Sequence, residues 1–244
     1  MMNCARWMMP MVLAAACGLS ANPLVLGTNW VVNGDAESDT GSTDGSIVPV
    51  SGWTACCGST LFTVVQYLPN NGFPGPGDPG PASRGANFFA GGPNVANASG
   101  SETIDVSGFA ASIDLGLLTF DASAYLGGYQ GQDDIAEFVV DFRDSSNALI
   151  SSGGVVGPDA MQRGSLTGLS LEENTGVIPV GTRSIQFILD MFRQDGTYDD
   201  GYADNLSFVV NGSSSSAPEP GSAGLMAVGG VVIAGLGWRR RVRG

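Results

Sequence analysis

Residues 183–192 read RSIQFILDMF, and this stretch indicates the fold class. Successive side chains of a β-strand point to opposite faces, so every second residue shares a face. One face of this stretch is uniformly apolar and consists of Ile185, Phe187, Leu189 and Met191. The other face mixes polar with apolar residues, which predicts a central strand that is covered on both sides.

Shorter stretches with the same alternation occur along most of the chain, without a convincing 3.6-residue helical period. We predict strands at 61–68, 113–120, 136–142, 183–192 and 203–210, and weaker ones at 103–106, 148–151 and 166–171. The connections are rich in Gly, Pro, Asn and Asp and too short for crossover helices. The expected fold is therefore all-β, an antiparallel two-sheet sandwich of jelly-roll type over residues 22–211.

The charge of the chain excludes several functional classes. The 244 residues include 23 acidic residues, ten basic residues that are all Arg, and no His, for a net charge of −13. Without His, neither a Ser-His-Asp triad nor an imidazole metal site can form. The arginines are too sparse to grip a phosphate backbone, so we expect no nucleic-acid partner.

The N-terminus has the order of a secretory signal peptide: Arg6, an apolar run to Leu19, and small residues up to Ala21. We expect residues 1–21 to form a signal helix that directs the chain to the secretion translocon. Cys17 lacks the leucine three residues before it that a lipoprotein cleavage site carries.

The C-terminus has three features in a fixed order. A Ser-rich linker at 212–217 precedes the motif Pro218, Glu219 and Pro220. An uncharged apolar stretch at about 222–238 follows, and it is expected to form a transmembrane helix. The basic tail at 239–243, with Arg239, Arg240 and Arg241, is expected to stay cytoplasmic.

This order, over residues 218–244, resembles the PEP-CTERM sorting signal of Gram-negative bacteria. In that family an exosortase, a membrane-embedded processing enzyme, cleaves near the motif during export. The resemblance implies an exosortase as partner and a precursor anchored in the inner membrane. It also implies a final place at the cell surface or in the extracellular matrix.

Two acid-rich segments lie near the ends of the expected domain: NGDAESD at 33–39, followed by Gly52-Trp53, and DDGYADNLS at 199–207. They resemble the opening and closing segments of galactose-binding-like sandwich modules, which include many carbohydrate-binding modules. In those families the first and last strands lie side by side and hold a structural Ca²⁺. The resemblance implies Glu37 and Asp204 as calcium ligands, with Asp35 nearby, and Ca²⁺ prefers such oxygen donors.

Sugar binding needs an aromatic face against the ring of the sugar and polar groups for its hydroxyls. Candidates in or beside the expected loops are Trp53, Tyr129, Gln130, Asp133, Arg193 and Tyr198, with Asp199 and Tyr202 beside the last of these. For Trp53, directly after a glycine, a place in the core is the alternative.

Cys4 and Cys17 fall in the signal segment, which leaves the adjacent Cys56 and Cys57 in the domain. In an oxidising compartment these two thiols have three alternatives: a vicinal disulfide, a free state, or pairing between chains. A metal or redox role would favour a spaced pair, so we expect a local turn constraint.

These observations predict an exported, non-catalytic, calcium-stabilised glycan-binding module associated with extracellular polysaccharide. The alternative is a structural matrix or envelope protein without a specific sugar ligand. A weaker alternative is an extracellular polysaccharide hydrolase. Against it, adjacent acids at 133–134 and 199–200 would point to opposite faces of a strand and cannot flank one glycosidic bond.

Overall fold

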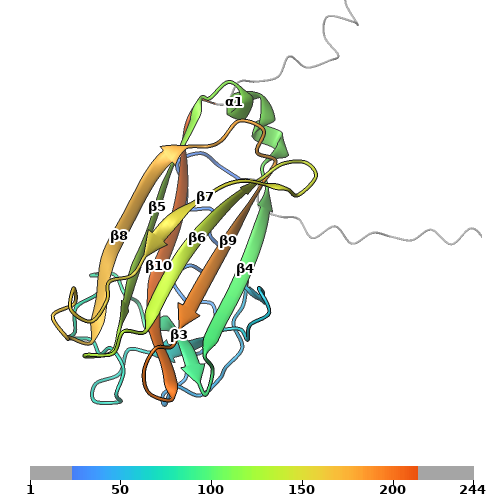
Figure 1. Ribbon diagram of the computed structural model, residues 1–244. Coiled ribbons are helices and arrows are strands. Elements are labelled where there is room, and N and C mark those ends of the chain that lie inside the picture. The colour runs from blue at the N-terminus through green and yellow to red at the C-terminus, as the bar shows by residue number, and fades with distance from the viewer. Residues whose placement is uncertain (1–23, 214–244) are drawn as a thin grey trace, which may run out of the picture.

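The computed structural model describes residues 24–213, which form two antiparallel β-sheets packed face to face (Figure 1). This confirms the expected all-β sandwich. The expected signal peptide at 1–21 and the expected sorting segment at 218–244 lie outside the described residues. Between residues 24 and 213, no helix has the length and apolar character needed to cross a membrane.

Each sheet has five strands, and all neighbouring strands are antiparallel. The first sheet has the order β1 (Thr54–Ala55), β4 (Asn97–Asp105), β9 (Ser184–Phe192), β6 (Ile135–Arg143), β7 (Leu149–Val156). The second has the order β2 (Thr63–Gln66), β3 (Asn87–Pro93), β10 (Tyr198–Gly212), β5 (Leu118–Gly128), β8 (Gly168–Val177). Apart from β2–β3 and β6–β7, consecutive strands lie in opposite sheets, which is the jelly-roll pattern.

Strand β9 lies between β4 and β6 at the centre of the first sheet, as its sequence predicts. Its uniformly apolar face is fully buried against the second sheet. On the opposite face Ile188 is 8% exposed, whereas Gln186 and Asp190 are half-buried. The outer face of this central strand is therefore only partly covered.

Aromatic rings from both sheets meet in the core. Phe208 of β10 is fully buried, and its ring centroid lies 5.2 Å from that of Phe120 and 5.1 Å from that of Phe187. Phe142 and Trp30 lie slightly farther from it, both at 6.3 Å. Because these rings come from β5, β6, β9 and the N-terminal segment, Phe208 connects the two sheets.

The predicted strand at 113–120 is wrong over its first half. Residues Ser107–Phe109 form a 3₁₀ turn (η1) and Ala110–Asp114 a short helix, α1, so that β5 begins only at Leu118. Ile113 is 1% exposed, but it is buried from the helix, and Leu115 is 67% exposed. Gly116 has φ +67°, a conformation that reverses the chain and favours glycine.

Alternation does not predict strand β3, and only its apolar pair, Phe88 and Phe89, indicates strand packing in the sequence. Its sequence, NFFAGGP, has two glycines where an apolar alternation would continue. A Cβ at Gly91 would lie 2.2 Å from Cγ of Asp199, so only glycine lets the buried Asp199 side chain pass over the strand. The glycine that hides the strand in the sequence is required by its packing.

The N-terminal segment runs along β10, which lies at the middle of the second sheet. Asn29 forms an isolated antiparallel bridge with Val209, and Trp30 N–H donates to Phe208 O at 2.9 Å. The Asn29 amide reinforces this contact, because its oxygen accepts from Phe208 N–H and its nitrogen donates to Leu206 O. The two ends of the domain, distant in sequence, therefore lie side by side.

Replacing Phe208 by Ala should lower the free energy of unfolding by about 3–5 kcal/mol, the usual cost of deleting a buried ring. Denaturant-induced unfolding measures this loss. The control Val177→Ala removes a side chain that is 56% exposed and should change stability by less than about 0.5 kcal/mol. Equal effects of the two variants would contradict the central place of Phe208.

Candidate functional site

The predicted calcium ligands Glu37 and Asp204 come from opposite ends of the domain and are held by separate hydrogen bonds. Asp204, on β10, accepts from the Tyr67 hydroxyl at 2.8 Å and from the next backbone N–H at 2.7 Å. Glu37 accepts with a single carboxylate oxygen from the N–H groups of Ala86 and Asn87, both at 2.8 Å. Glu37 thus ties the N-terminal segment to the start of β3.

The three predicted carboxylates lie close enough for their charges to interact. Burial raises the pKa of Asp204 from 3.8 to about 8, and the negative charges of Glu37 and Asp35 add to the rise. The charges of Asp35 and Glu37 therefore reach Asp204. The three carboxylates are not among the described side chains whose ligand atoms meet within 4.8 Å of one another. A cation is the partner that would lower the cost of ionising Asp204 in this position.

A polar surface pocket of about 370 Å³ opens beside Asp35, between the N-terminal segment and β10. Its lining is Asn29, Val31, Asn33, Gly34, Asp35, Asn205, Leu206 and Ser207. Asn205 has φ +50° and lies in an irregularity of the pairing between β10 and β5. This bulge interrupts the ladder at the pocket, as bulges do beside many functional sites.

The outer face of the second sheet carries an aromatic cluster of its own. Tyr67, Phe88 and Tyr202 are buried there with Val65, Ala90 and Leu169. Phe73, from the Pro- and Gly-rich loop at 70–81, lies over them at 5.2 Å from the Tyr198 ring and 6.3 Å from the Tyr202 ring. The loop at 70–81 therefore covers part of this sheet face.

Three half-buried tyrosines surround this cluster: Tyr125, Tyr129 and Tyr198. Tyr129 and Tyr198 both pack against the cluster that contains the buried Tyr202. The Tyr198 hydroxyl donates to Gly45 O at 3.0 Å, which fixes that ring. The structure thus brings two predicted sugar-binding aromatics to one face, and it adds Tyr125, which sequence reasoning missed.

The polar candidates lie in the loops that follow this face. Gln130 and Asp133 are exposed, and Asp133 accepts from Ala160 N–H at 3.0 Å. Arg193, half-buried, donates to Gly196 O at 3.2 Å in the loop between β9 and β10. The β5–β6 loop and the β9–β10 loop, which hold these residues, lie at the same end of the sandwich, in the lower part of Figure 1.

Trp53 is placed differently from the other candidates. It is 5% exposed, and its ring centroid lies 5.4 Å from that of Phe62 and 6.2 Å from that of Phe89. Its ring faces are therefore unavailable to a sugar, and we leave Trp53 out of any proposed binding surface. Core placement was the alternative that its sequence context indicated.

Arg163 is a residue at this end that sequence reasoning missed. Its guanidinium donates to Gln132 O at 2.8 Å and to Pro158 O at 2.7 Å, and so joins the β5–β6 loop to the β7–β8 loop. It also lines a pocket of about 170 Å³ between Pro79 and Leu169. The sequence could not predict this role, because every residue has a backbone carbonyl and the identity of an acceptor residue carries no signal.

Of the two acidic pairs that a hydrolase would need, Asp133 is exposed, whereas Asp134, Asp199 and Asp200 are buried. Asp134 is 0% exposed and accepts backbone N–H groups of Gln194, Asp195 and Asp200. Asp199 is also 0% exposed, and its Oδ2 has no hydrogen-bond partner. Burial raises the pKa of Asp199 to about 7 and that of Asp200 to about 6. Asp134, Asp199 and Asp200 are therefore not accessible to a polymer.

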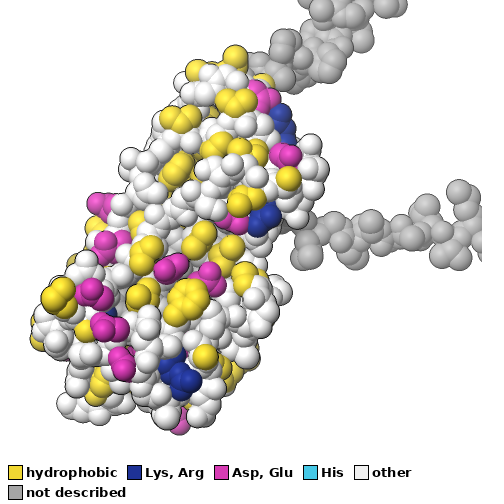
Figure 2. Space-filling view, viewed as in Figure 1, with side chains coloured by type: hydrophobic (Ala, Val, Ile, Leu, Met, Phe, Trp, Pro, Cys, Tyr) yellow, Lys and Arg dark blue, Asp and Glu magenta, His cyan; other side chains and the backbone are white. Residues whose placement is uncertain are grey.

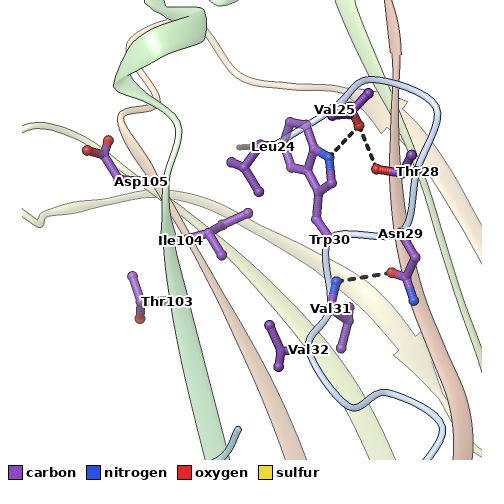
Figure 3. Close-up of a pocket in the computed structure, with 10 residues that line it drawn as sticks. All are labelled: Leu24, Val25, Thr28, Asn29, Trp30, Val31, Val32, Thr103, Ile104 and Asp105. Atoms are coloured by element: carbon purple, nitrogen blue, oxygen red, sulfur yellow. Dashed lines mark hydrogen bonds between the residues drawn. The ribbon is translucent and has the colours of Figure 1, made fainter. Parts of the chain in front are cut away.

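A pocket of about 700 Å³ contains none of the predicted site residues, although it shares Asn29 and Val31 with the pocket beside Asp35 (Figure 3). It opens between the N-terminal segment and β4, with Leu24 and Ile104 beside the Trp30 ring. The Trp30 indole N–H donates to Val25 O at 2.9 Å, and Trp30 itself is 4% exposed. No stacking platform for a sugar is therefore available on Trp30.

The surface is predominantly acidic, and Figure 2 shows acidic side chains spread over the face it presents, with few basic ones. Residues 24–213 contain two ion pairs, Arg143 with Asp141 and Arg183 with Asp114, each at 2.7 Å. Most carboxylates in this part of the chain therefore lack a protein cation. Such a surface favours divalent cations and neutral glycans over polyanions.

Without added cations, the domain should lose stability as the pH rises from about 4 to 8. The pKa values of Asp200, Asp199 and Asp204 are raised to about 6, 7 and 8, so the folded chain keeps protons that the unfolded chain releases near pH 4. Carboxyls with lowered pKa values, such as Asp44 at about 2, change their protonation only at lower pH and so do not affect stability in this range. Thermal unfolding in a chelating buffer measures how stability changes with pH. Asp204→Asn should reduce this change above pH 6. A stability that rises between pH 4 and 8 would contradict the prediction.

The last residues match a family model described as the PEP-CTERM protein-sorting motif, at residues 216–241. No curated protein sequence matches the chain significantly. Among solved structures, the chain is similar to a family 16 carbohydrate binding module, with 16% identity and a TM-score of 0.45, over 74% of this chain and 99% of that one. It is also similar to the CBM22-1 xylan-binding domain of Paenibacillus barcinonensis Xyn10C, with 13% identity and a TM-score of 0.37, over 71% and 92%.

A third similar structure is the enzymatically active domain of tailspike protein 4 of bacteriophage CBA120, with 16% identity and a TM-score of 0.45. That match covers 75% of this chain but only 22% of the tailspike chain. With identities and TM-scores this low, these likenesses carry no argument about function. The sorting motif does: the chain carries a PEP-CTERM motif behind a two-sheet β-sandwich and is therefore an exported protein.

Proposed function

We propose that the sandwich is a non-catalytic glycan-binding module, stabilised by Ca²⁺, that binds extracellular polysaccharide after export. The observation that supports it best is the outer face of the second sheet, where half-buried tyrosines adjoin exposed polar loops. Tyrosine rings of this kind stack on sugar rings, while amide, carboxylate and guanidinium groups address the hydroxyls. The binding surface would combine Tyr125, Tyr129 and Tyr198 with Gln130, Asp133 and Arg193.

The route of the protein is the second part of this proposal. A signal peptide at 1–21 would take the chain to the translocon, and an apolar stretch at 222–238 would anchor the precursor in the inner membrane. The sorting motif implies processing by an exosortase. Release at the cell surface or into the matrix would then bring the sandwich to its polysaccharide.

We propose the calcium site at Asp204, with Glu37 and Asp35, because the charges of these two carboxylates reach Asp204. Two carboxylates far apart in sequence gain most from a shared cation, because the ion then fastens the N-terminal segment to β10. Glu37 has one carboxylate oxygen outside its two backbone hydrogen bonds, and this oxygen would serve as a ligand. The raised pKa of Asp204 would return toward its usual range in the presence of the ion.

Ca²⁺ at 100 times its dissociation constant should stabilise the domain by about 2.7 kcal/mol, and EDTA should reverse the effect. The increment should be larger at pH 8 than at pH 5, because the ion competes with the proton on Asp204. Differential scanning calorimetry measures it. Asp204→Asn should remove the increment, whereas Glu173→Gln, which deletes an exposed charge on β8, should keep it. An unchanged melting temperature on chelation would remove the calcium site.

Polysaccharide affinity should fall about tenfold for Tyr129→Ala, since one stacked ring contributes about 1.4 kcal/mol. Glycan-array screening followed by calorimetric titration of the best glycan measures this change. The control Leu149→Ala removes an exposed side chain on the first sheet and should leave the affinity unchanged. If no glycan binds, with or without Ca²⁺, the lectin function is refuted while the fold and calcium results still stand.

A structural matrix role is a second candidate, favoured by the two neighbouring edge strands β7 and β8. Leu149 and Val156 on β7 are 54% and 57% exposed, and Leu171 and Val177 on β8 are 45% and 56% exposed. Exposed aliphatic residues on edge strands promote association between copies. Concentration-dependent sedimentation that Val177→Lys abolishes would support this role; a monomer at all concentrations would refute it.

A further inference from the structure

Cys56 and Cys57 lie in a tight turn directly after β1, on the first sheet. Ser59 N–H donates to Cys56 O at 2.9 Å and closes the turn, and its two central residues, Cys57 and Gly58, have φ values of +61° and +80°. Positive φ at both central positions is the geometry of a type I′ turn. In an extended strand adjacent side chains would point apart, but this turn lets both thiols lie on the same side.

The turn is fastened to the neighbouring strand β4. Cys56 N–H donates to Ser99 O at 3.2 Å, Ser99 N–H donates to Thr60 O at 2.7 Å, and the Ser59 hydroxyl bonds the Asn97 amide oxygen. The Cys56 thiol lies 2.9 Å from the Ser99 hydroxyl. These bonds, which do not involve the Cys57 side chain, hold the thiol pair in place over the sheet.

Opposite the thiols lies a row of polar side chains across three strands. Ser99 of β4 pairs in register with Asp190 of β9, which pairs with Glu137 of β6. The Ser99 hydroxyl donates to Asp190 Oδ1. The nearby charge of Asp190 adds to the burial that raises the pKa of Glu137. Neither of the two ion pairs within residues 24–213 involves Asp190 or Glu137, so this row has no protein cation.

The two Sγ atoms and a carboxylate oxygen of Asp190 all lie within 4.8 Å of one another. Among the described residues, no other group of three or more Cys, Asp and Glu side chains brings its ligand atoms this close together. Two sulfurs bound to one tetrahedral Zn²⁺ would be about 3.8 Å apart, given Zn–S bonds near 2.3 Å. Small side-chain rotations are therefore enough to close the group on an ion.

We propose that Cys56, Cys57 and Asp190 form a second metal site, selective for zinc-class ions and independent of the glycan and calcium proposals. Thiolate pairs select Zn²⁺ over Ca²⁺, which prefers oxygen ligands only. On binding, both thiols release their protons to solvent, and a water molecule completes the tetrahedron because Cys57 is exposed. The ion would join the turn after β1 to the central strand β9 across β4.

The test uses the full-length chain with Cys4→Ser and Cys17→Ser, so that Cys56 and Cys57 are its remaining thiols. The reduced protein is titrated with Co²⁺, whose bonds to thiolates give a charge-transfer absorption in the near ultraviolet. Zn²⁺ should bleach this absorption with a stoichiometry of one ion per chain. Competition against a chromophoric chelator then gives the affinity for Zn²⁺.

Cys57→Ser should weaken Zn²⁺ binding more than about 100-fold and Asp190→Asn at least about tenfold, because changes outside the ligand shell already cost 10–100-fold. Glu173→Gln, which removes an equal charge from the other sheet, should leave the affinity unchanged. Zn²⁺ should also protect both thiols of the unsubstituted domain from alkylation, which needs no variant to fold. Absence of the cobalt–thiolate band in the reduced protein, or binding that Asp190→Asn does not weaken, would overturn the proposal.

Discussion

The contact of Phe208 with rings from the facing sheet is the interaction on which the rest of the structure depends. Phe208 lies near the middle of β10, and Phe187 and Phe142 meet it from β9 and β6. This packing sets the orientation of every strand, since alternation sends the residues between the core positions to the outer faces. Alternation therefore places the tyrosine cluster on the outer face of the second sheet and Asp190 on the outer face of the first sheet.

The N-terminal segment depends on the same contact. It has no strand of its own, but Asn29 and Trp30 bind β10 around Phe208. As a result Glu37 comes close to Asp204, although 167 positions separate them in the numbering of the chain. Ionising carboxylates near one another without a protein cation is costly, and this cost is the physical ground for the proposed calcium ion.

The two sheets differ in what their outer faces offer. On the second sheet the loop at 70–81 lays Phe73 on an aromatic cluster, and half-buried tyrosines remain at its margin. On the first sheet the central strand presents Asp190 instead, beside a pair of thiols. An exported protein with few basic residues thus has two chemically distinct surfaces, one proposed to bind sugar rings and one proposed to bind a thiophilic ion.

By itself, the sequence determined the sorting motif, the all-β class and the position of β9, because composition and strict alternation act locally. It misplaced the start of β5, since the apolar residues of α1 also fit a strand pattern. Of β3 it indicated only the Phe88-Phe89 pair, because glycine follows where the buried Asp199 side chain passes over the strand. Tertiary structure alone decided that Trp53 is core, that Tyr125 joins Tyr129 on one face, and that Asp190 meets two cysteines. Those outcomes depend on contacts between distant strands, and a one-dimensional pattern records the face of a residue but not its neighbours.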